Sequence, residues 1–218
     1  MKIVTIILAR GGSKGVPNKN IKDINGQPLI AFSILESLKS CVDETWVSSD
    51  SDEILEVSKK YGAKTIKRPI ELSSDNSKSE DALLHFSENV DFDYIVFIQP
   101  TSPFISYSKI DEGIEMILSE KYDSIFSAYK EHWIPRWTLE NKPSNWDVYN
   151  RPMRQDVEEQ YVENGAFYIT SKKLLQESKL RYSGSIGIIE MSEMESKQID
   201  TYNDFKYVET IMKMNEYE

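Results

Sequence analysis

Short apolar runs alternate with segments of helical periodicity through the first 127 residues of this chain. Two of the runs, 3–8 and 94–98, are almost wholly apolar, which is typical of strands buried on both faces of a parallel sheet. The expected strands are 3–8, 44–49, 64–67, 94–98 and 123–127, and the expected helices are 28–38, 52–61, 79–90 and 106–119. The alternation predicts βαβ units and an α/β fold with a mostly parallel central sheet flanked by helices.

The alternation stops near residue 129, where the chain becomes rich in aromatic and turn-forming residues. Three of the four tryptophans and two prolines follow without a clear period: Trp133, Trp137, Trp146, Pro135 and Pro143. We expect a small irregular or hairpin lobe over the sheet at about 129–163, inserted into a single domain that spans 1–218. Its aromatic side chains suit a ligand cover or a dimer contact, and a small satellite core explains them equally well.

Regular patterns return after this lobe. We expect strands at 165–169 and 185–189, a capped helix at 171–177 and a terminal helix at 202–214. The second half of the chain therefore continues the α/β pattern of the first.

Composition and charge narrow the classes of function. The formal net charge of −10 and the pI near 4.9 argue against nucleic acid as a partner. No apolar stretch reaches about 18 residues, so no membrane-spanning helix is expected. The apolar start ends at Arg10 without a small-residue cleavage site, and we interpret it as a strand, not a signal peptide. The lone Cys41 excludes an intramolecular disulfide and suits a cytoplasmic location.

The loop after the first expected strand gathers three cations in this acidic protein. Arg10, Lys14 and Lys19 alternate there with three glycines, which allow the backbone to approach a ligand closely. The loop matches neither the Walker A pattern nor the dinucleotide fingerprint. Because ligands bind beyond the carboxyl ends of strands in open α/β sheets, the pattern favours a polyanionic ligand such as a nucleoside triphosphate. A solvated Gly/Lys turn is the alternative.

Six segments, in order along nearly the whole chain, resemble the acylneuraminate cytidylyltransferases, also called CMP-sialic acid synthetases, which share their fold with the CMP-Kdo synthetases. The segments are 8–20, 47–50, 68–72, 99–103, 154–155 with 164–168, and 199–201. The first, LARGGSKGVPNKN, and the fourth, QPTSP, are the most specific. The resemblance implies a Rossmann-like nucleotidyltransferase fold and a homodimer. It also implies transfer of CMP from CTP to the anomeric hydroxyl of a nine-carbon 2-keto sugar acid, with release of pyrophosphate.

The resemblance also implies a nucleotide site. Its residues are Leu8, Ala9, Arg10, Gly12, Ser13, Lys14, Lys19, Asn20, Arg68 and Ser79. Arg10, Lys14 and Lys19 are the expected catalytic cations, because phosphoryl transfer depends on positioning and on neutralising charge. The backbone of Leu8 and Ala9 is expected to contact cytosine. For Arg68, a surface ion pair is the alternative.

The implied acceptor residues are Gln99, Thr101, Arg154, Asn164 and Tyr168. Arg154 is the expected partner of the acceptor carboxylate, because a guanidinium binds a carboxylate through two hydrogen bonds. For Gln99 and Thr101 a turn shaped by Pro and Ser is the alternative. Tyr168 is equally compatible with burial in a strand.

The resemblance further implies Mg²⁺, for which Mn²⁺ can substitute. Where the family commonly has Asp-x-Asp, this chain has Gln198-Ile199-Asp200, so only the second acid is present. Asp200 is the expected metal ligand, and Gln198 is expected to contribute a neutral carbonyl, directly or through water. The alternative for Asp200 is the N-cap of the last helix.

Several functions stay open on the sequence alone. The acceptor is expected to be a sialic, legionaminic or pseudaminic acid, and an enzyme for Kdo or another keto acid is the alternative. An enzyme that acts on sugar 1-phosphates would call for a second cation cluster in the later half of the chain, and the sequence has none. A nucleotide-binding relative with weakened catalysis is supported only by Gln198.

Overall fold

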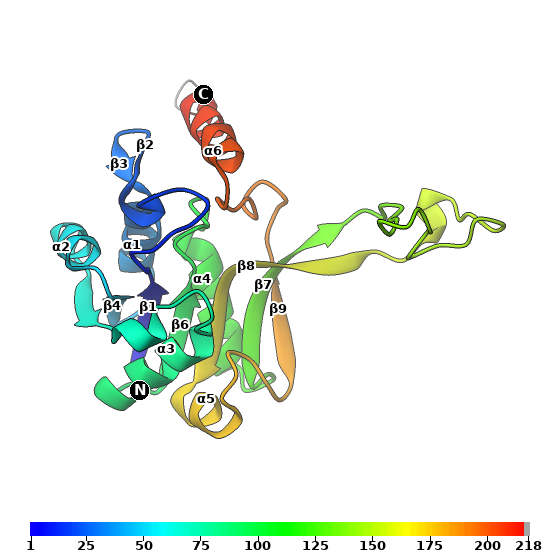
Figure 1. The fold of residues 1–218 in the computed structure, drawn as a ribbon. Helices are drawn as coiled ribbons and strands as arrows, with labels where there is room; N and C mark the ends of the chain where they lie inside the picture. The colour runs from blue at the N-terminus through cyan, green and yellow to red at the C-terminus, as the bar shows by residue number, and fades with distance from the viewer. Residues whose placement is uncertain (216–218) are drawn as a thin grey trace.

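The computed structural model describes residues 1–215 and is built around a sheet of order β5-β4-β1-β6-β8-β7-β9 (Figure 1). The strands are β1 (Ile3–Leu8), β4 (Glu44–Ser49), β5 (Lys64–Lys67), β6 (Tyr94–Ile98), β7 (Ser124–Glu131), β8 (Gln160–Ser171) and β9 (Ile186–Glu190). Strands β5, β4, β1 and β6 are parallel to one another, and β7 is parallel to β9, whereas β8 is antiparallel to both β6 and β7. The predicted, mostly parallel sheet is confirmed.

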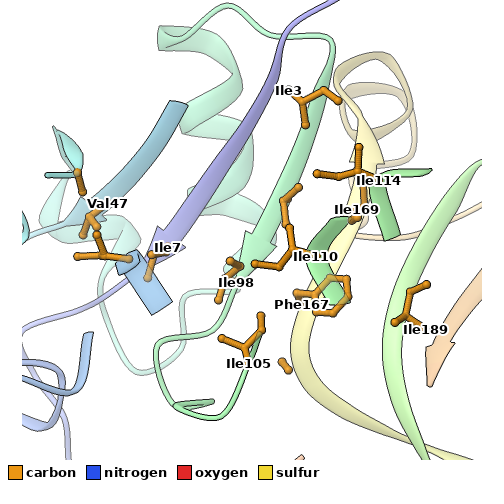
Figure 2. Close-up of a cluster of buried hydrophobic side chains, with 14 of the residues drawn as sticks. Ile3, Ile7, Val47, Ile98, Ile105, Ile110, Ile114, Phe167, Ile169 and Ile189 are labelled. Carbon is orange, nitrogen blue, oxygen red and sulfur yellow. The ribbon is translucent and has the colours of Figure 1, made fainter. Parts of the chain in front are cut away.

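Helices cover both faces of this sheet. They are α1 (Leu29–Lys39), α2 (Asp52–Lys60), α3 (Ser79–Asn89), α4 (Tyr107–Leu118) and α5 (Lys172–Ser178). A further helix, α6 (Tyr202–Asn215), packs instead in a separate cluster with Ile24, Leu29 and Ile199. Because alternate strand residues point to opposite faces, Ile3 and Ile7 of β1 pack with α1, α2 and α4 (Figure 2), while Val4 and Ile6 pack with α3 and α5. Both faces of β1 are therefore buried, as its apolar sequence predicts.

Every strand and helix predicted within the first 127 residues is present, with ends that differ by a few residues at most. A short hairpin formed by β2 (Asp23–Ile24) and β3 (Gln27–Pro28) was not predicted. Its turn uses Asn25 and Gly26, both at positive φ, which is the conformation that two-residue hairpin turns require. Pro28 lies in β3 and directly precedes α1, so the helix begins one residue later than predicted.

The predicted lobe is a long antiparallel hairpin, here called the arm and defined as residues 129–163 (Figure 1). Residues 129–131 and 160–163 continue β7 and β8, so the expected strand at 165–169 is much longer than the sequence indicates. The remaining part of the arm is irregular, with isolated bridges between Trp137 and Pro143 and between Asp147 and Asn150. The arm projects away from the sheet, whereas the sequence pattern was interpreted as a lobe over it.

Within residues 1–215, no helix combines the length and the apolar character that crossing a bilayer requires.

The side chain of Glu44, in β4, contacts residues of β4 and β5 and the residue just before β1. Its carboxylate accepts hydrogen bonds from Lys64 Nζ and Trp46 Nε1, both at 2.7 Å, and pairs with Lys2 Nζ at 3.1 Å. The hydrogen bond from Lys64 lowers the pKa of Glu44 from 4.5 to about 2, against the opposing effect of burial. The charged carboxylate is therefore favoured in the folded state.

We predict that Glu44→Gln lowers the free energy of unfolding near neutral pH and that its effect shrinks in acid. Because the folded pKa of Glu44 lies below the unfolded one, its stabilisation is present above pH 4.5 and is lost as the pH falls toward 2. Urea unfolding from about pH 7 down to about pH 3 measures this difference. Glu56→Gln, which removes an exposed pair with Lys59, is the control. A Glu44→Gln effect that is the same at every pH would contradict the assignment.

Candidate functional site

A cavity of about 410 Å³ opens beside the loop that follows β1, at the carboxyl ends of β1 and β6. This is the edge of an open α/β sheet at which ligands bind. The predicted site residues that line the cavity are Leu8, Arg10, Ser13, Lys14, Lys19, Asn20, Arg68, Ser79, Gln99, Thr101 and Asp200. The structure therefore brings the predicted nucleotide segments, the QPTSP segment and Asp200 to one cavity.

Side-chain hydrogen bonds fix the shape of the loop formed by residues 9–20. The Asp50 carboxylate, just after β4, accepts a hydrogen bond from the Gly11 amide at 2.9 Å. The buried Asn20 donates from Nδ2 to the carbonyl oxygen of Arg10 at 3.0 Å, and the Val16 side chain is fully buried. The loop is thus a defined structure that holds its charged side chains along the cavity, in place of the solvated turn that the sequence left open.

Two predicted nucleotide residues of this loop do not line the cavity. Ala9 is fully buried in the core, and its amide donates to the carbonyl oxygen of Ser48 at 3.0 Å. Gly12 is exposed, with no heavy atom within 4 Å of the place that a Cβ would occupy. Their contacts with a nucleotide stay a prediction.

The loop is held against the segment 199–200, from the other end of the chain. Lys19 Nζ donates to the carbonyl oxygen of Ile199 at 2.7 Å and pairs with Asp200 Oδ1 at 3.1 Å. The backbone approach is so close that a Cβ on Gly15 would lie 2.2 Å from the carbonyl oxygen of Asp200. Only glycine fits here without moving one of the two segments.

Arg68 is buried, with 5% of its surface exposed, although it lines the cavity. Its Nε donates to Ser73 Oγ at 2.9 Å, and no salt bridge within residues 1–215 includes it. The surface ion pair considered for this residue is therefore not formed. Burial lowers the pKa of the Arg68 guanidinium, while the Asp50 carboxylate acts in the opposite direction. A buried guanidinium without an ion pair has spare donors for a carbonyl or a phosphate oxygen.

Tyr168 does not line the cavity and is separated from it by the ring of Phe97. Its ring stacks between Phe97, which lines the cavity, and Tyr182, with centroid separations of 5.6 and 5.8 Å. Its hydroxyl donates to a carboxylate oxygen of Glu163, and burial raises its pKa well above the usual value. The structure thus has Tyr168 buried in its strand, the alternative that the sequence left open, and direct contact with a sugar stays a prediction.

Asn164 and Gln198 connect the segments around the cavity. Asn164 Oδ1 accepts from Ser127 Oγ at 2.6 Å, and its Nδ2 donates to Ser196 Oγ at 2.8 Å. Gln198 Nε2 donates to the Asn164 carbonyl oxygen, while its Oε1 accepts from Thr101 Oγ1 at 3.2 Å. Both polar ends of the Gln198 side chain are thus engaged with protein, and its role as a metal ligand stays a prediction.

Asp200 does not cap the last helix. Thr201 and Asp204 form a reciprocal cap before α6, in which the Thr201 amide donates to Asp204 Oδ2 at 2.7 Å and the Asp204 amide donates to Thr201 Oγ1 at 3.2 Å. Thr201 and Asp204 therefore cap α6, and Asp200 does not take the N-cap role that was its alternative. The Asp200 side chain is 72% exposed and lies at the cavity beside Lys19.

Within the described part of the chain, no group of three or more His, Cys, Asp or Glu side chains is placed to hold a metal ion. Magnesium does not require such a group, because it is commonly bound by one or two carboxylates together with substrate phosphates. Asp200, an exposed carboxylate beside the cations of the cavity, fits that kind of site.

Arg154 lies elsewhere, in a hollow of about 460 Å³ on the arm. The hollow is lined by His132, Trp133, Gln155, Val157 and Glu159 as well as Arg154. The chain therefore does not bring this predicted carboxylate-binding residue to the cavity that Gln99 and Thr101 line.

Comparison with known proteins identifies the family, since residues 4–218 match the cytidylyltransferases. The chain belongs to the cytidylyltransferase family. It is 39% identical over 216 residues to N-acylneuraminate cytidylyltransferase A of Danio rerio, an alignment that covers 95% of this chain and 50% of that protein. It is 31% identical over 227 residues to pseudaminic acid cytidylyltransferase of Campylobacter jejuni, which covers 99% of this chain and 98% of that protein. The chain thus spans about half the length of the first relative.

Solved structures share the fold of this chain. A CMP:2-keto-3-deoxy-manno-octonic acid synthetase complexed with CTP superimposes with a TM-score of 0.76 at 18% identity, covering 99% of this chain and 100% of that one. The 4-diphosphocytidyl-2C-methyl-D-erythritol synthase of Anaerococcus prevotii gives 0.68 at 13% identity, covering 97% and 98%. These likenesses confirm the predicted Rossmann-like nucleotidyltransferase fold.

Several cavity residues were not predicted from the sequence. They are Gly15, Leu72, Ser73, Ser74, Asp75, Ser77, Lys78, Phe97 and Pro100. Most lie between β5 and α3 in the run Ser-Ser-Asp-Asn-Ser-Lys, whose composition indicates a turn but not its position over the cavity. Phe97 had a detectable signal, because it lies two residues before Gln99 in an extended segment and so shares its face.

We predict that Gly15→Ala destabilises the protein, because the added methyl group would meet the Asp200 carbonyl oxygen at 2.2 Å. Overpacking of this kind costs about 1–3 kcal/mol, which urea unfolding would measure. Gly12→Ala is the matched control, since its Cβ would meet no heavy atom within 4 Å. Equal stability of the two variants would show that the loop does not rest on segment 199–200.

Proposed function

We propose that this chain transfers CMP from CTP to the anomeric hydroxyl of a 2-keto sugar acid and releases pyrophosphate. The acceptor is a nine-carbon acid of the sialic, legionaminic or pseudaminic type. The observation that carries the proposal is the single cavity that unites the cationic loop, the buried Arg68 and the QPTSP segment. The names of the Danio rerio and Campylobacter jejuni relatives support the acceptor class.

The reaction joins the acceptor oxygen to the α-phosphorus of CTP, breaks the bond from that phosphorus to the departing pyrophosphate, and releases the hydroxyl proton to the solvent. Arg10, Lys14 and Lys19 bind the phosphates and neutralise the charge that develops on the leaving group. Arg68 donates a hydrogen bond to the base, and Gln99 and Thr101 orient the sugar. Asp200 would hold Mg²⁺, or Mn²⁺, together with phosphate oxygens, and the ion would supply further positive charge.

We predict pyrophosphate release from CTP with N-acetylneuraminic, legionaminic or pseudaminic acid, and none from UTP, GTP or ATP. Lys19→Ala should lower kcat about 100-fold or more, because it removes a preorganised positive charge at the phosphates. Lys22→Ala is the control, since its ammonium group lies over the Tyr202 and Phe205 rings and does not line the cavity.

A coupled pyrophosphate assay over these nucleotides, the three acids, Kdo and a set of sugar phosphates measures the outcome. Turnover with Kdo alone would move the acceptor to the smaller keto acid. Turnover with a sugar 1-phosphate would contradict the proposal. A lack of turnover with every acceptor in the set would also contradict it.

The second part of the proposal is a homodimer formed through the arm. The arm carries exposed apolar side chains in a number that is unusual for a segment in contact with water: Ile134, Trp137, Leu139, Val148, Tyr149 and Met153. Docking of this surface on a second copy would bury them. It would also allow Arg154 to reach the acceptor carboxylate in the cavity of the other copy, which explains how a residue on a projecting arm can serve the acceptor.

We predict that Leu139→Asp shifts the protein toward the monomer, because Leu139 is fully exposed in the single chain and a buried carboxylate in the contact is costly. Sedimentation velocity measures the shift over a range of protein concentrations. Leu180→Asp, an exposed leucine beyond the arm, is the control. A wild-type protein that sediments as a monomer at all concentrations would contradict the dimer.

A further inference from the structure

One side of the cavity is formed by residues 73–78, a segment between β5 and α3 that is called the strap below. Short-range hydrogen bonds hold it: Ser74 Oγ contacts Ser77 Oγ at 2.7 Å, and Ser77 Oγ donates to the Glu71 carbonyl oxygen at 2.9 Å. Arg68, which also lines the cavity, donates a hydrogen bond from Nε to Ser73 Oγ of the strap. The strap is therefore a local turn, tied to the rest of the cavity by the Arg68 hydrogen bond and by Asp75.

The strap places one carboxylate against two of the cavity's cations. Asp75 Oδ1 lies 2.8 Å from the Arg10 guanidinium, and Asp75 Oδ2 lies 2.5 Å from Lys14 Nζ. Hydrogen bonds from Lys14 and then Arg10 lower the pKa of Asp75, so the carboxylate is charged at neutral pH. The two oxygens of Asp75 thus hold the same donors that the proposed function assigns to the phosphates.

We infer that the strap is an intramolecular placeholder, in which Asp75 occupies the phosphate-binding cations until a polyphosphate displaces it. This inference rests on the proposed function, since it takes Arg10 and Lys14 as the cations that bind CTP. The ligand's phosphates and the Asp75 carboxylate are both anionic and compete for the N–H donors of Arg10 and Lys14, so binding of one weakens binding of the other. Entry of CTP releases the strap from Arg10 and Lys14, and departure of pyrophosphate lets Asp75 return.

The exposure of these groups makes the exchange easy. The side chains of Arg10, Asp75 and Lys14 are 36%, 42% and 77% exposed, and ion pairs of such exposure contribute little to stability. A polyphosphate carries several negative charges against the single charge of Asp75 and therefore prevails. Lys19 takes no part in this exchange, because it is only 13% exposed and is bound to Ile199 and Asp200 instead.

The test is a comparison of ligand affinity between wild type and Asp75→Asn, which keeps the size of the side chain and removes its charge. Calorimetry with CTP and with inorganic pyrophosphate, each in EDTA and in Mg²⁺, gives the dissociation constants. We expect Asp75→Asn to bind both ligands about threefold to tenfold more tightly, as removal of a weak exposed competitor predicts. The gain should diminish as salt is added.

Two further variants separate the placeholder from a general effect of charge. Asp91→Asn also removes one negative charge, from an exposed carboxylate 3.5 Å from Lys172, and should leave both affinities unchanged. In a Lys14→Met background, Asp75→Asn should produce a smaller gain, because one of the two cations that Asp75 occupies is absent.

An affinity in Asp75→Asn that equals or falls below that of the wild type would overturn the inference. A loss confined to Mg²⁺ would do the same and would make Asp75 part of a metal site. Failure of the proposed function gives a different result, because the wild type would then bind pyrophosphate without any preference for CTP. In that case the pyrophosphate affinities of wild type and Asp75→Asn would still test the placeholder. If neither protein bound either ligand, both proposals would fail.

Discussion

The contact between the loop 9–20 and the segment 199–200 is the constraint on which the candidate site depends. Lys19 reaches across it to the carbonyl oxygen of Ile199, and glycine at position 15 allows the two backbones to touch. Ile199 is itself fully buried in a cluster that includes Phe205 and Val208 of α6. Packing of α6 around Ile199 therefore helps to position the loop after β1, and the cavity is lined both by this loop and by Asp200.

The second feature of this site is its concentration of positive charge. The protein is acidic overall, with a formal net charge of −10, yet the cavity gathers Arg10, Lys14 and Lys19. Each of these cations faces a carboxylate, either Asp75 or Asp200. Neutralisation of this kind allows like charges to stay close together without a ligand. At Arg10 and Lys14 the arrangement is therefore suited to exchange one set of anionic oxygens for another.

Local sequence signals predicted most of the fold, and long-range contacts account for what was missed. The apolar runs at 3–8 and 94–98 identify the central strands, since burial on both faces leaves little choice of residue. The length of the arm's strands was not predicted, because these strands leave the core and the apolar pattern is lost at residues 160–163. The site follows the same rule: the loop cations were found from their spacing, whereas Asp75 belongs to a polar turn whose partners lie 61 and more residues away. Gln198 stays a predicted metal ligand, and its hydrogen bonds with Thr101 and Asn164 could not be predicted from the sequence.

A crystal structure of the protein with CTP bound tests this site most directly. We predict that the phosphates lie against Arg10, Lys14 and Lys19, with the base near Arg68 and the segment 199–200 in contact with the loop as it is here. A complex in which the triphosphate binds elsewhere, while residues 10–20 face open solvent, would contradict it.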